Sequence, residues 1–447
     1  MTTRLFGTDG VRGTAGHYPL DHDTVARLGA ALVRAMRHGG GTAVRFLVGR
    51  DTRESGEWIE RELARGAGSE GADVVSAGVL PTPAIAYVTR STNFHAGLVI
   101  SASHNPFQDN GIKVFSGSGE KFTEALEREV EAIVARADWQ VPAAAEARTQ
   151  RADFTDAYLA HVRLALPKPE RLGRMRLAVD TANGAAVAVA SRLFRELGFE
   201  VTLLGATPDG RNINLECGST HPEALVRAVR EHGCRMGVAF DGDGDRALFV
   251  DARGRVVDGD AVMLMCARHR KTLGQLPGDA IVATVMSNIG LELALRESGI
   301  NLIRTAVGDK YVMEEMMKRN LAIGGEQSGH IIFSDHLYTG DGLATALNVL
   351  NVMADTGREL ADLASQLVAF PQVLVNVRVR EKRDLQSVPQ VAAAMDAVEK
   401  RLAGQGRLLV RYSGTEPLLR VMLEGRDQQE IQAWAAEIAG TVREHLG

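Results

Sequence analysis

The chain has 447 residues, 45% of them hydrophobic and 24% charged, which is enough for about three or four domains of an ordinary soluble protein. The net charge of −5 argues against a general nucleic-acid binder, and no stretch reaches the ~18 apolar residues of a membrane span. The N-terminus lacks the apolar core of a signal peptide and the three cysteines are an odd number, so we expect a cytoplasmic chain with reduced thiols.

The first 150 residues alternate short apolar strands with amphipathic helices, the pattern of an α/β domain. Asp23 is expected to cap the first helix. That helix has one apolar face: Val25, Leu28, Leu32 and Met36. Strand-like runs follow at 46–50, 72–79 and 96–102. A charged helix is predicted from Thr123 to about Ala137.

The rest of the chain divides at changes in this pattern. Residues 139–150 lack apolar periodicity and are expected to connect the first unit to a second. The second and third units again alternate strands and helices, which predicts two more α/β domains. From about Pro371, two adjacent strands lie between two helices, which predicts a smaller α+β domain. The predicted domains are 1–150, 151–256, 257–370 and 371–447.

The motif DGDGDR lies between two strand-like runs and carries three carboxylates, on Asp241, Asp243 and Asp245. The intervening glycines let the backbone curl so that alternate side chains converge on one hard cation. An EF-hand would need Gly where Arg246 stands and Glu where Ala252 stands. A solvated acidic turn is the alternative, although three such carboxylates repel one another without a cation. Oxygen ligands favour Mg²⁺, which normally binds a phosphate as well.

Two glycine-containing segments are candidate phosphate sites. RYSGTEP (411–417) joins two predicted strands and offers Arg411, two hydroxyls and the N–H groups of a turn. Arginine binds phosphate bidentately and turn N–H groups form anion nests, although a plain hairpin would have the same composition. FGTDGVRG, with Arg12, and VGRDTRESG, with Arg50, are weaker candidates, because arginines at strand ends are commonly solvated.

The segment GGEQSGHIIF (324–333) follows a predicted strand. Glu326 and Ser328 suit the vicinal hydroxyls of a sugar, since one carboxylate accepts two hydrogen bonds. Helix capping is the alternative role for these residues. His330 is either part of the same site or a core histidine.

The segment ISASHNPFQDNGIKVF (100–115) leaves an apolar strand, gathers small polar residues and resumes as a strand. We expect it to present an exposed Ser103 hydroxyl to a ligand. A serine hydrolase would need a G-x-S-x-G elbow, and in an extended chain His104 would point to the other face. The absence of a Walker loop argues against a nucleotide-driven kinase. A phosphorylated Ser103 beside a Mg²⁺ site accounts for both motifs, with Lys113 as an acid/base or phosphate clamp.

These motifs, in this order, resemble those of the α-D-phosphohexomutases, and in SASHNP and GEQSGH those of the bacterial phosphoglucosamine mutases. The likeness runs from Phe6 to about Arg420. It implies four domains around a central cleft: three similar α/β domains and a smaller C-terminal α+β domain. One departure is Lys310, where many relatives carry Arg, and we expect this position to tolerate either cation.

The resemblance also implies a role for each matching residue. Ser103 would be the phosphorylated serine and, with Asp241, Asp243 and Asp245, would hold one Mg²⁺ per subunit. Proton handling and charge stabilisation would fall to Arg12, Lys113 and His330, with the identity of the base left open. Glu326 and Ser328 would bind sugar hydroxyls. The distal phosphate would be bound by Arg411, Ser413, Gly414 and Thr415.

The implied reaction converts glucosamine 6-phosphate to glucosamine 1-phosphate, for amino-sugar nucleotide and cell-wall synthesis. Glucosamine or glucose 1,6-bisphosphate would be the intermediate or activator, and the only partner expected beyond a possible second subunit is this small-molecule substrate. Phosphomannomutase or phosphoglucomutase activity is the alternative within the class. A hydrolase using Ser103 and a metal-dependent sugar-phosphate-binding protein are the alternatives outside it. Monomer and homodimer both stay open.

Overall fold

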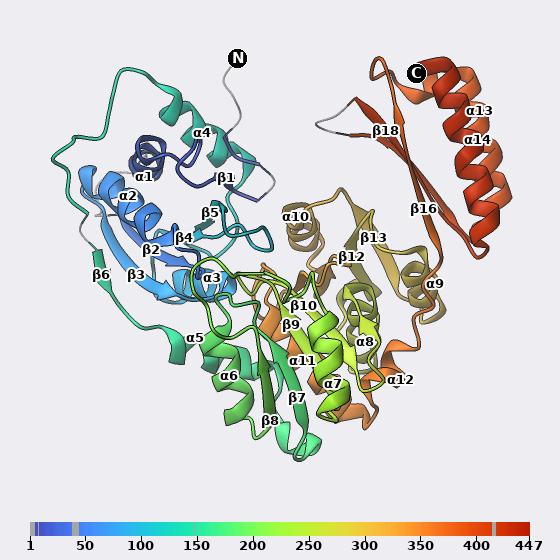
Figure 1. The fold of residues 1–447 in the computed structure, drawn as a ribbon, viewed down its shortest axis with the longest axis horizontal. Helices are drawn as coiled ribbons and strands as arrows, with labels where there is room; N and C mark the ends of the chain where they lie inside the picture. Colours follow the sequence, from blue (N-terminus) through green and yellow to red (C-terminus); the bar gives the residue numbers. More distant parts are fainter. Residues whose placement is uncertain (1–4, 8, 38–43, 148, 414–416) are drawn as a thin grey trace. The chain divides into compact units, whose positions relative to one another are not determined.

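The computed structural model describes residues 5–7, 9–37, 44–147, 149–413 and 417–447 (Figure 1). The chain forms two compact units. The first comprises Met1–Met286 with Ile300–Gln366 and contains three sheets. The second comprises Ser287–Gly299 with Leu367–Gly447 and contains a fourth sheet. The predicted fold class, three α/β domains followed by a smaller α+β domain, agrees with this division into sheets.

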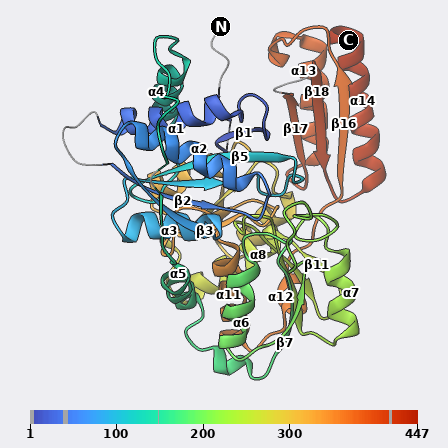
Figure 2. The same cartoon turned by 60° about the vertical axis from the view of Figure 1, so that its left-hand side comes forward.

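The first sheet has six strands in the order β1-β5-β4-β2-β3-β6. Its strands are β1 (Val11–Thr14), β2 (Arg45–Arg50), β3 (Asp73–Val79), β4 (Ala96–Ile100), β5 (Asp109–Ser116) and β6 (Thr149–Arg151). Its helices are α1 (His22–Met36), α2 (Gly56–Ser69), α3 (Thr82–Ser91) and α4 (Glu124–Ala135). Figure 2 shows α1 and α2 on one face of the sheet and α3 on the other. The apolar face of α1 therefore enters the core, as its periodicity predicts.

The cap of α1 differs from the sequence prediction. Asp21, rather than Asp23, is the N-cap, because its carboxylate accepts the N–H of Thr24 at 2.9 Å. Asp23 lies in the first turn, where a negative charge interacts favourably with the helix dipole. The segment predicted as a connector ends in β6, which pairs with β3 and forms the edge of the first sheet.

The second sheet has the order β11-β10-β9-β7-β8 and the third β13-β12-β14-β15. The second comprises β7 (Arg176–Asp180), β8 (Glu200–Leu204), β9 (Met236–Phe240), β10 (Ala247–Asp251) and β11 (Val256–Val257), with α5 (Thr155–Val162), α6 (Val187–Glu196) and α7 (Glu223–Glu231). The third comprises β12 (Ala280–Thr284), β13 (Asn301–Thr305), β14 (Ile323–Gly325) and β15 (Ile331–Phe333), with α8 (Gly259–Thr272), α10 (Asp309–Arg319), α11 (Gly342–Thr356) and α12 (Leu360–Ala364).

These three sheets share one topological feature that positions the site. In each, a parallel strand is followed directly by an antiparallel neighbour: β4 by β5, β9 by β10 and β14 by β15. The loops that join these pairs leave the carboxyl ends of parallel strands, where α/β sheets bind their ligands. The SASHNP, DGDGDR and GEQSGH motifs occupy these three equivalent loops.

The second unit has a three-stranded antiparallel sheet in the order β16-β18-β17. Its elements are α9 (Ile289–Glu297), β16 (Gln372–Arg378), α13 (Pro389–Leu402), β17 (Arg407–Tyr412), β18 (Leu418–Glu424) and α14 (Gln428–Leu446). Figure 1 shows α13 and α14 on the same side of the sheet, where their apolar faces form one core with it. Helix α9 belongs to this unit because the Glu424 carboxylate accepts the N–H of Ile289 at 3.0 Å.

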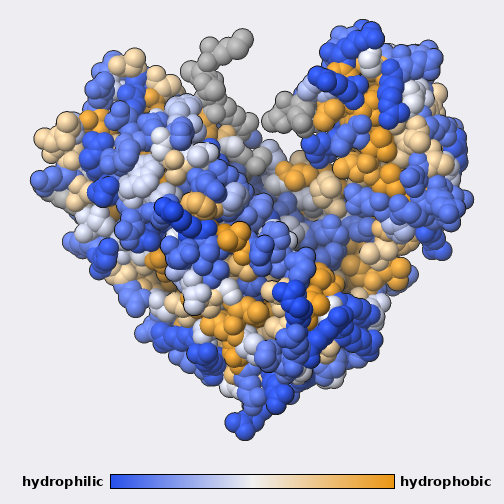
Figure 3. Space-filling view, viewed as in Figure 1, coloured by the Kyte–Doolittle hydropathy of each residue, from blue (hydrophilic) through white to orange (hydrophobic). Residues whose placement is uncertain are grey.

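Polar side chains cover most of the face shown in Figure 3, with hydrophobic side chains exposed in smaller groups among them. In the described part of the chain, no helix has the length and apolar character needed to cross a membrane.

A buried carboxylate joins α5 to the start of α11. Asp341 caps α11 by accepting the N–H of Ala344 at 2.9 Å, and it accepts the Tyr158 hydroxyl at 3.0 Å. Its second oxygen, Oδ2, is buried with no hydrogen-bond partner among the described residues. Burial raises the pKa of Asp341 from 3.8 to about 6.

We expect Asp341→Asn to stabilise the chain at pH 8 by roughly 1 to 3 kcal/mol. Because the folded-state pKa is raised, the folded chain holds a proton that the unfolded chain releases between about pH 4 and 6. The stability of the wild type therefore falls as pH rises through this window, whereas asparagine stays neutral and still caps the helix. Urea unfolding at pH 5 and 8 measures the gain, which should be smaller at pH 5. The explanation would be contradicted if Asp341→Asn raised the free energy of unfolding equally at pH 5 and pH 8. It would also be contradicted if Asp427→Asn, at an exposed helix cap, gave the same stabilisation.

Candidate active site

The three equivalent loops of the first unit converge through their side chains. The Ser103 hydroxyl, from the β4–β5 loop, donates to Asp241 Oδ2 in the β9–β10 loop. His330, from the β14–β15 loop, places Nδ1 3.4 Å from Asp245 Oδ1. All four side chains are buried, so the structure gathers a hydroxyl, an imidazole and carboxylates at one place.

Ser103 lies in a left-handed turn, with φ of +53°. Two expectations from the sequence are wrong here. The hydroxyl is buried rather than exposed, with 1% of the residue accessible. His104 does not point to the other face, because the chain is not extended at Ser103, and its Nδ1 lies 3.3 Å from Ser103 Oγ. Burial, with Arg246 and Arg12 nearby, lowers the pKa of His104 to about 4, so its ring is neutral at pH 7.

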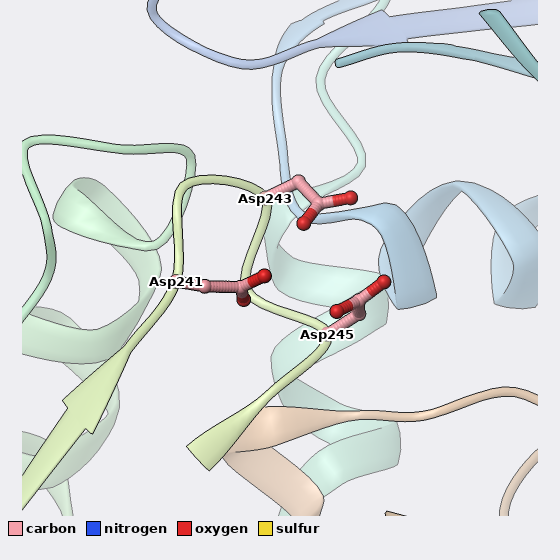
Figure 4. Close-up of side chains that lie close together, drawn as sticks. All are labelled: Asp241, Asp243 and Asp245. Carbon is pink, nitrogen blue, oxygen red and sulfur yellow. The ribbon is translucent and has the colours of Figure 1, made fainter. Parts of the chain in front are cut away.

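The three aspartates point toward one another (Figure 4), with one oxygen from each lying within 4.8 Å of the others. Gly244 supplies a positive φ of +72°, which the turn between Asp243 and Asp245 requires. Asp243 Oδ1 is buried without a hydrogen-bond partner among the described residues, whereas Asp245 Oδ1 lies 3.4 Å from His330 Nδ1. Burial and the two neighbouring carboxylates raise the pKa of Asp241 well above its usual value. An all-oxygen donor set with a buried, unpaired acceptor on Asp243 fits a hard divalent cation, so the residues present suit a metal ion.

Lys113, on β5, supplies the buried positive charge next to this triad. Its Nζ lies 2.8 Å from Asp243 Oδ2, 2.9 Å from Asp245 Oδ2 and 3.2 Å from Asp9 Oδ2. Burial alone would lower the pKa of Lys113, but these carboxylates raise it well above its usual value. The ammonium is therefore held charged where an anionic group approaching Ser103 would meet it.

Two further charged groups connect Lys113 to His330, and the sequence analysis missed both. Lys121 pairs with Asp9 and with Asp309, and Asp309 Oδ2 lies 3.3 Å from His330 Nε2. Burial would lower the pKa of His330, but Asp245 and Asp309 raise it. The contacts of Lys121 with Asp9 and Asp309 join residues 112 and 188 positions apart, so no local pattern in the sequence indicates them.

A cavity of about 560 Å³ opens beside the triad. Charged and polar side chains from all three domains of the first unit line it, among them Asp9, Arg12, His104, Asp245, Arg246, Asp309, Glu326 and His330. The volume is in the range that accommodates a small-molecule ligand. Two arginines, Arg12 and Arg246, and the imidazoles of His104 and His330 line the cavity, which makes a phosphorylated ligand chemically suitable.

Glu326 and Ser328 lie together in the β14–β15 loop. Ser328 Oγ donates to Glu326 Oε2 at 3.4 Å, and Glu326 Oε1 accepts the N–H of Gly308 at 3.3 Å. Glu326 lines the cavity, whereas Ser328 is exposed and lies outside its lining.

The predicted phosphate loop belongs to the second unit. Arg411 lies on β17 directly opposite Arg420 on β18, and Ser413 is buried at the end of β17. Gly414 and Thr415 lie outside the described residues.

Arg50, a weaker phosphate candidate, and Lys310, the departure from the family pattern, both have structural partners. Arg50 pairs with Glu57 and Glu60 on α2, away from the triad. Lys310 is buried and pairs with Glu127 on α4 at 2.8 Å. The arginine of VGRDTRESG that reaches the Ser103 turn is Arg53, whose fully buried guanidinium donates to the carbonyls of Ser103 and Asn105.

Comparison with known proteins identifies the family of the chain. Four models of phosphoglucomutase/phosphomannomutase match the chain: alpha/beta/alpha domain I at 3–141, domain II at 152–254, domain III at 258–370 and the C-terminal domain at 374–441. A phosphoglucosamine mutase from Syntrophotalea carbinolica is 47% identical over 100% of this chain and 99% of its own length.

Solved structures of lower identity share the fold. A putative phosphomannomutase from Thermus thermophilus has a TM-score of 0.81 at 23% identity, covering 99% of this chain and 100% of that one. The N-acetylphosphoglucosamine mutase of Aspergillus fumigatus, solved with GlcNAc-6P and magnesium, has a TM-score of 0.70 at 19% identity, covering 98% and 95%. With relatives near 47% identity along its whole length, the chain belongs to the phosphoglucosamine mutases, within the phosphoglucomutase/phosphomannomutase family.

Proposed function

We propose that the chain interconverts D-glucosamine 6-phosphate and α-D-glucosamine 1-phosphate through a phosphoserine at Ser103 and glucosamine 1,6-bisphosphate. The enzyme is an isomerase of the intramolecular phosphotransferase class, as its family membership indicates. The observation that supports the proposal most strongly is the hydrogen bond of the Ser103 hydroxyl to Asp241 within the triad. A phosphoryl group on that oxygen would lie next to the proposed metal ligands.

Mg²⁺ is the metal we assign to Asp241, Asp243, Asp245 and the phosphoserine oxygen. The Aspergillus relative, solved with magnesium, supports this choice, as does the all-oxygen donor set. Bound Mg²⁺ would neutralise charge on the transferring phosphoryl group. Lys113, already held charged by buried carboxylates, would stabilise the same oxygens.

The remaining roles follow from position around the cavity. Arg12 and His330 line it and, with Lys113, would stabilise charge and move the proton of the attacking sugar hydroxyl. Glu326 and Ser328 would bind sugar hydroxyls. After the first transfer the bisphosphate would turn end over end and return its other phosphoryl group to Ser103. Glucose 1,6-bisphosphate would phosphorylate the resting enzyme in the same way.

The distal phosphate we assign to Arg411, Ser413, Gly414 and Thr415. We also propose four domains, of which the first three supply the loops around Ser103. Their limits are 1–150, 151–256, 257–370 and 371–447. We place the enzyme in the cytoplasm, as a monomer or homodimer, supplying amino-sugar nucleotide and cell-wall synthesis.

Incubation with glucosamine 6-phosphate and Mg²⁺, followed by phosphorus NMR, tests the function. The α-1-phosphate isomer is the expected product. Free phosphate would indicate a hydrolase that uses Ser103, and an unchanged spectrum would indicate a sugar-phosphate-binding protein. Faster turnover of glucose 6-phosphate or mannose 6-phosphate would instead assign a phosphoglucomutase or phosphomannomutase.

Arg411→Ala is expected to lower catalytic efficiency about ten- to a hundredfold in both directions, because the same loop would bind the phosphate that is not transferred. A charge-assisted, bidentate contact contributes roughly 1.5 to 3 kcal/mol, and ~1.4 kcal/mol corresponds to one decade of rate. Steady-state rates in the two directions measure the loss. Arg401→Ala, which removes an exposed pair with Glu437 in the same unit, is the matched control and should leave both rates unchanged. A hundredfold loss in one direction alone would require a second phosphate site.

A further inference from the structure

The Ser103 turn is held by side chains that the proposed reaction does not itself use. A left-handed φ costs a serine free energy, so surrounding contacts must maintain it. The N–H of Ser103 donates to Ser101 Oγ at 2.9 Å, and Ser101 Oγ donates to the buried carboxylate of Asp51. Asp51 in turn pairs with Arg53 at 2.9 Å, with both side chains fully buried. One side of the turn is thus anchored to a buried ion pair.

Arg53 spans the other side of the turn. Its Nη2 donates to the carbonyls of Ser103 at 3.1 Å and Asn105 at 2.6 Å, and its Nε donates to the carbonyl of Asp109 at 2.8 Å. The rigid, planar fork of a guanidinium satisfies these acceptors simultaneously, which the single ammonium of lysine does not do.

Asn214, from the second domain, donates to the same two carbonyls. Its Nδ2 lies 2.9 Å from the Ser103 oxygen and 3.1 Å from the Asn105 oxygen. Gly242, between the first two aspartates of the triad, closes the third side, since a Cβ at this position would lie 2.5 Å from the Ser103 oxygen. The Ser103 carbonyl is therefore enclosed by Arg53, Asn214 and the backbone of the metal loop. A shift of the turn would move the hydroxyl relative to Asp241.

We propose that Arg53 and Asn214 are positioning residues for phosphoryl transfer: they fix the Ser103 turn so that its hydroxyl, free or phosphorylated, stays aligned with the aspartate triad. This rests on the proposed role of Ser103 as the phosphoryl carrier. Neither side chain is assigned a contact with the substrate, the metal or the reacting oxygens. Their substitution should therefore slow the chemical steps without weakening substrate or metal binding.

Asn214→Asp and Asn214→Gly are the principal variants. Aspartate keeps the shape but replaces the donor with an oxygen that faces two carbonyl oxygens. Glycine removes the amide and keeps the left-handed backbone, since Asn214 has φ of +59°. Because a misplacement of about 1 Å costs on the order of a hundredfold in rate, we expect kcat to fall about ten- to a hundredfold. KM for glucosamine 6-phosphate and the affinity for Mn²⁺, measured by calorimetry, should stay within about threefold. Arg53→Lys should behave in the same way.

Arg27→Lys is the matched control. Arg27 also donates to backbone carbonyls, among them Trp139 at 2.7 Å, but it holds the end of α4 rather than the Ser103 turn. We expect this variant to unfold at a lower temperature with kcat within about threefold of the wild type. A comparable loss of kcat in Arg27→Lys would show that general destabilisation, and not positioning, explains the other variants.

Phosphorylation of Ser103 by glucose 1,6-bisphosphate, followed by mass spectrometry, separates this inference from the proposed function. Wild-type enzyme that gains no phosphate on Ser103 would overturn the proposed function. The positioning role is supported if the wild type gains phosphate on Ser103 and the variants at Asn214 and Arg53 gain it ten- to a hundredfold more slowly. Variants phosphorylated as fast as the wild type, or variants that lose substrate and metal affinity together with kcat, would overturn the positioning role. If Arg53→Lys does not fold, the result for Asn214→Gly is the test.

Discussion

Ser103→Ala is expected to abolish phosphoryl transfer and leave the fold intact. A covalent carrier has no substitute, so its loss should cost many orders of magnitude in rate. The backbone conformation need not change, since alanine and serine have the same Cβ, and the turn is held by Arg53, Asn214 and Ser101 rather than by the hydroxyl. Phosphorus NMR measures turnover, and mass spectrometry measures phosphate on the protein.

Ser118→Ala provides the control for this variant, because Ser118 is an exposed serine in the turn after β5. It should retain wild-type turnover and phosphorylation. Activity of Ser103→Ala within about tenfold of the wild type would rule out the phosphoserine, because no other route reaches comparable rates without the covalent carrier.

Asp243→Ala should remove activity and metal affinity together. Mg²⁺ requires near-octahedral coordination and gives up its bound water with difficulty, so the two remaining carboxylates would bind it weakly. Without the metal, the transferring phosphoryl group loses several kcal/mol of charge stabilisation, which corresponds to about a thousandfold or more in rate. Asp243 also pairs with Lys113 and accepts the Thr82 hydroxyl, so Asp243→Asn, which keeps the shape, distinguishes metal loss from a packing defect. Both variants should bind Mn²⁺ weakly in calorimetry.

Chelation tests the same site in the wild type. Excess EDTA should abolish the activity of the wild type, and added Mg²⁺ should restore that activity. Asp251→Asn is the matched control for Asp243→Asn. Asp251 is equally buried in the same domain, but it pairs with Arg255 outside the triad. Full activity in excess EDTA would show that the triad holds no essential metal.

The sequence predicted the features whose physics is local. Alternating carboxylates with glycine between them can converge whatever the rest of the fold does, so DGDGDR indicated a cation site directly. The apolar periodicity of α1 and the alternation of strands and helices predicted three α/β domains and an α+β domain, and the sheets agree. The individual roles assigned to the site residues stay predictions.

The sequence prediction failed where conformation depends on distant contacts. The orientation of His104 was wrong because Arg53 and Asn214 hold Ser103 in a left-handed conformation that its neighbours in the chain do not specify. Arg50 and Arg53 look alike as arginines near a strand end, yet Arg50 pairs with glutamates on α2 and Arg53 is buried beneath the Ser103 turn.

The sequence by itself thus determined the family, the order of the domains and the motifs to which we assign the chemistry. Only the tertiary structure decided which charges meet around Ser103. The contacts of Lys113 with Asp243 and of Lys121 with Asp309 span 130 and 188 residues. They form because the tertiary fold brings the region of β5 together with the DGDGDR loop and with the start of α10, and the energies of buried ion pairs depend on that shared burial rather than on spacing along the chain.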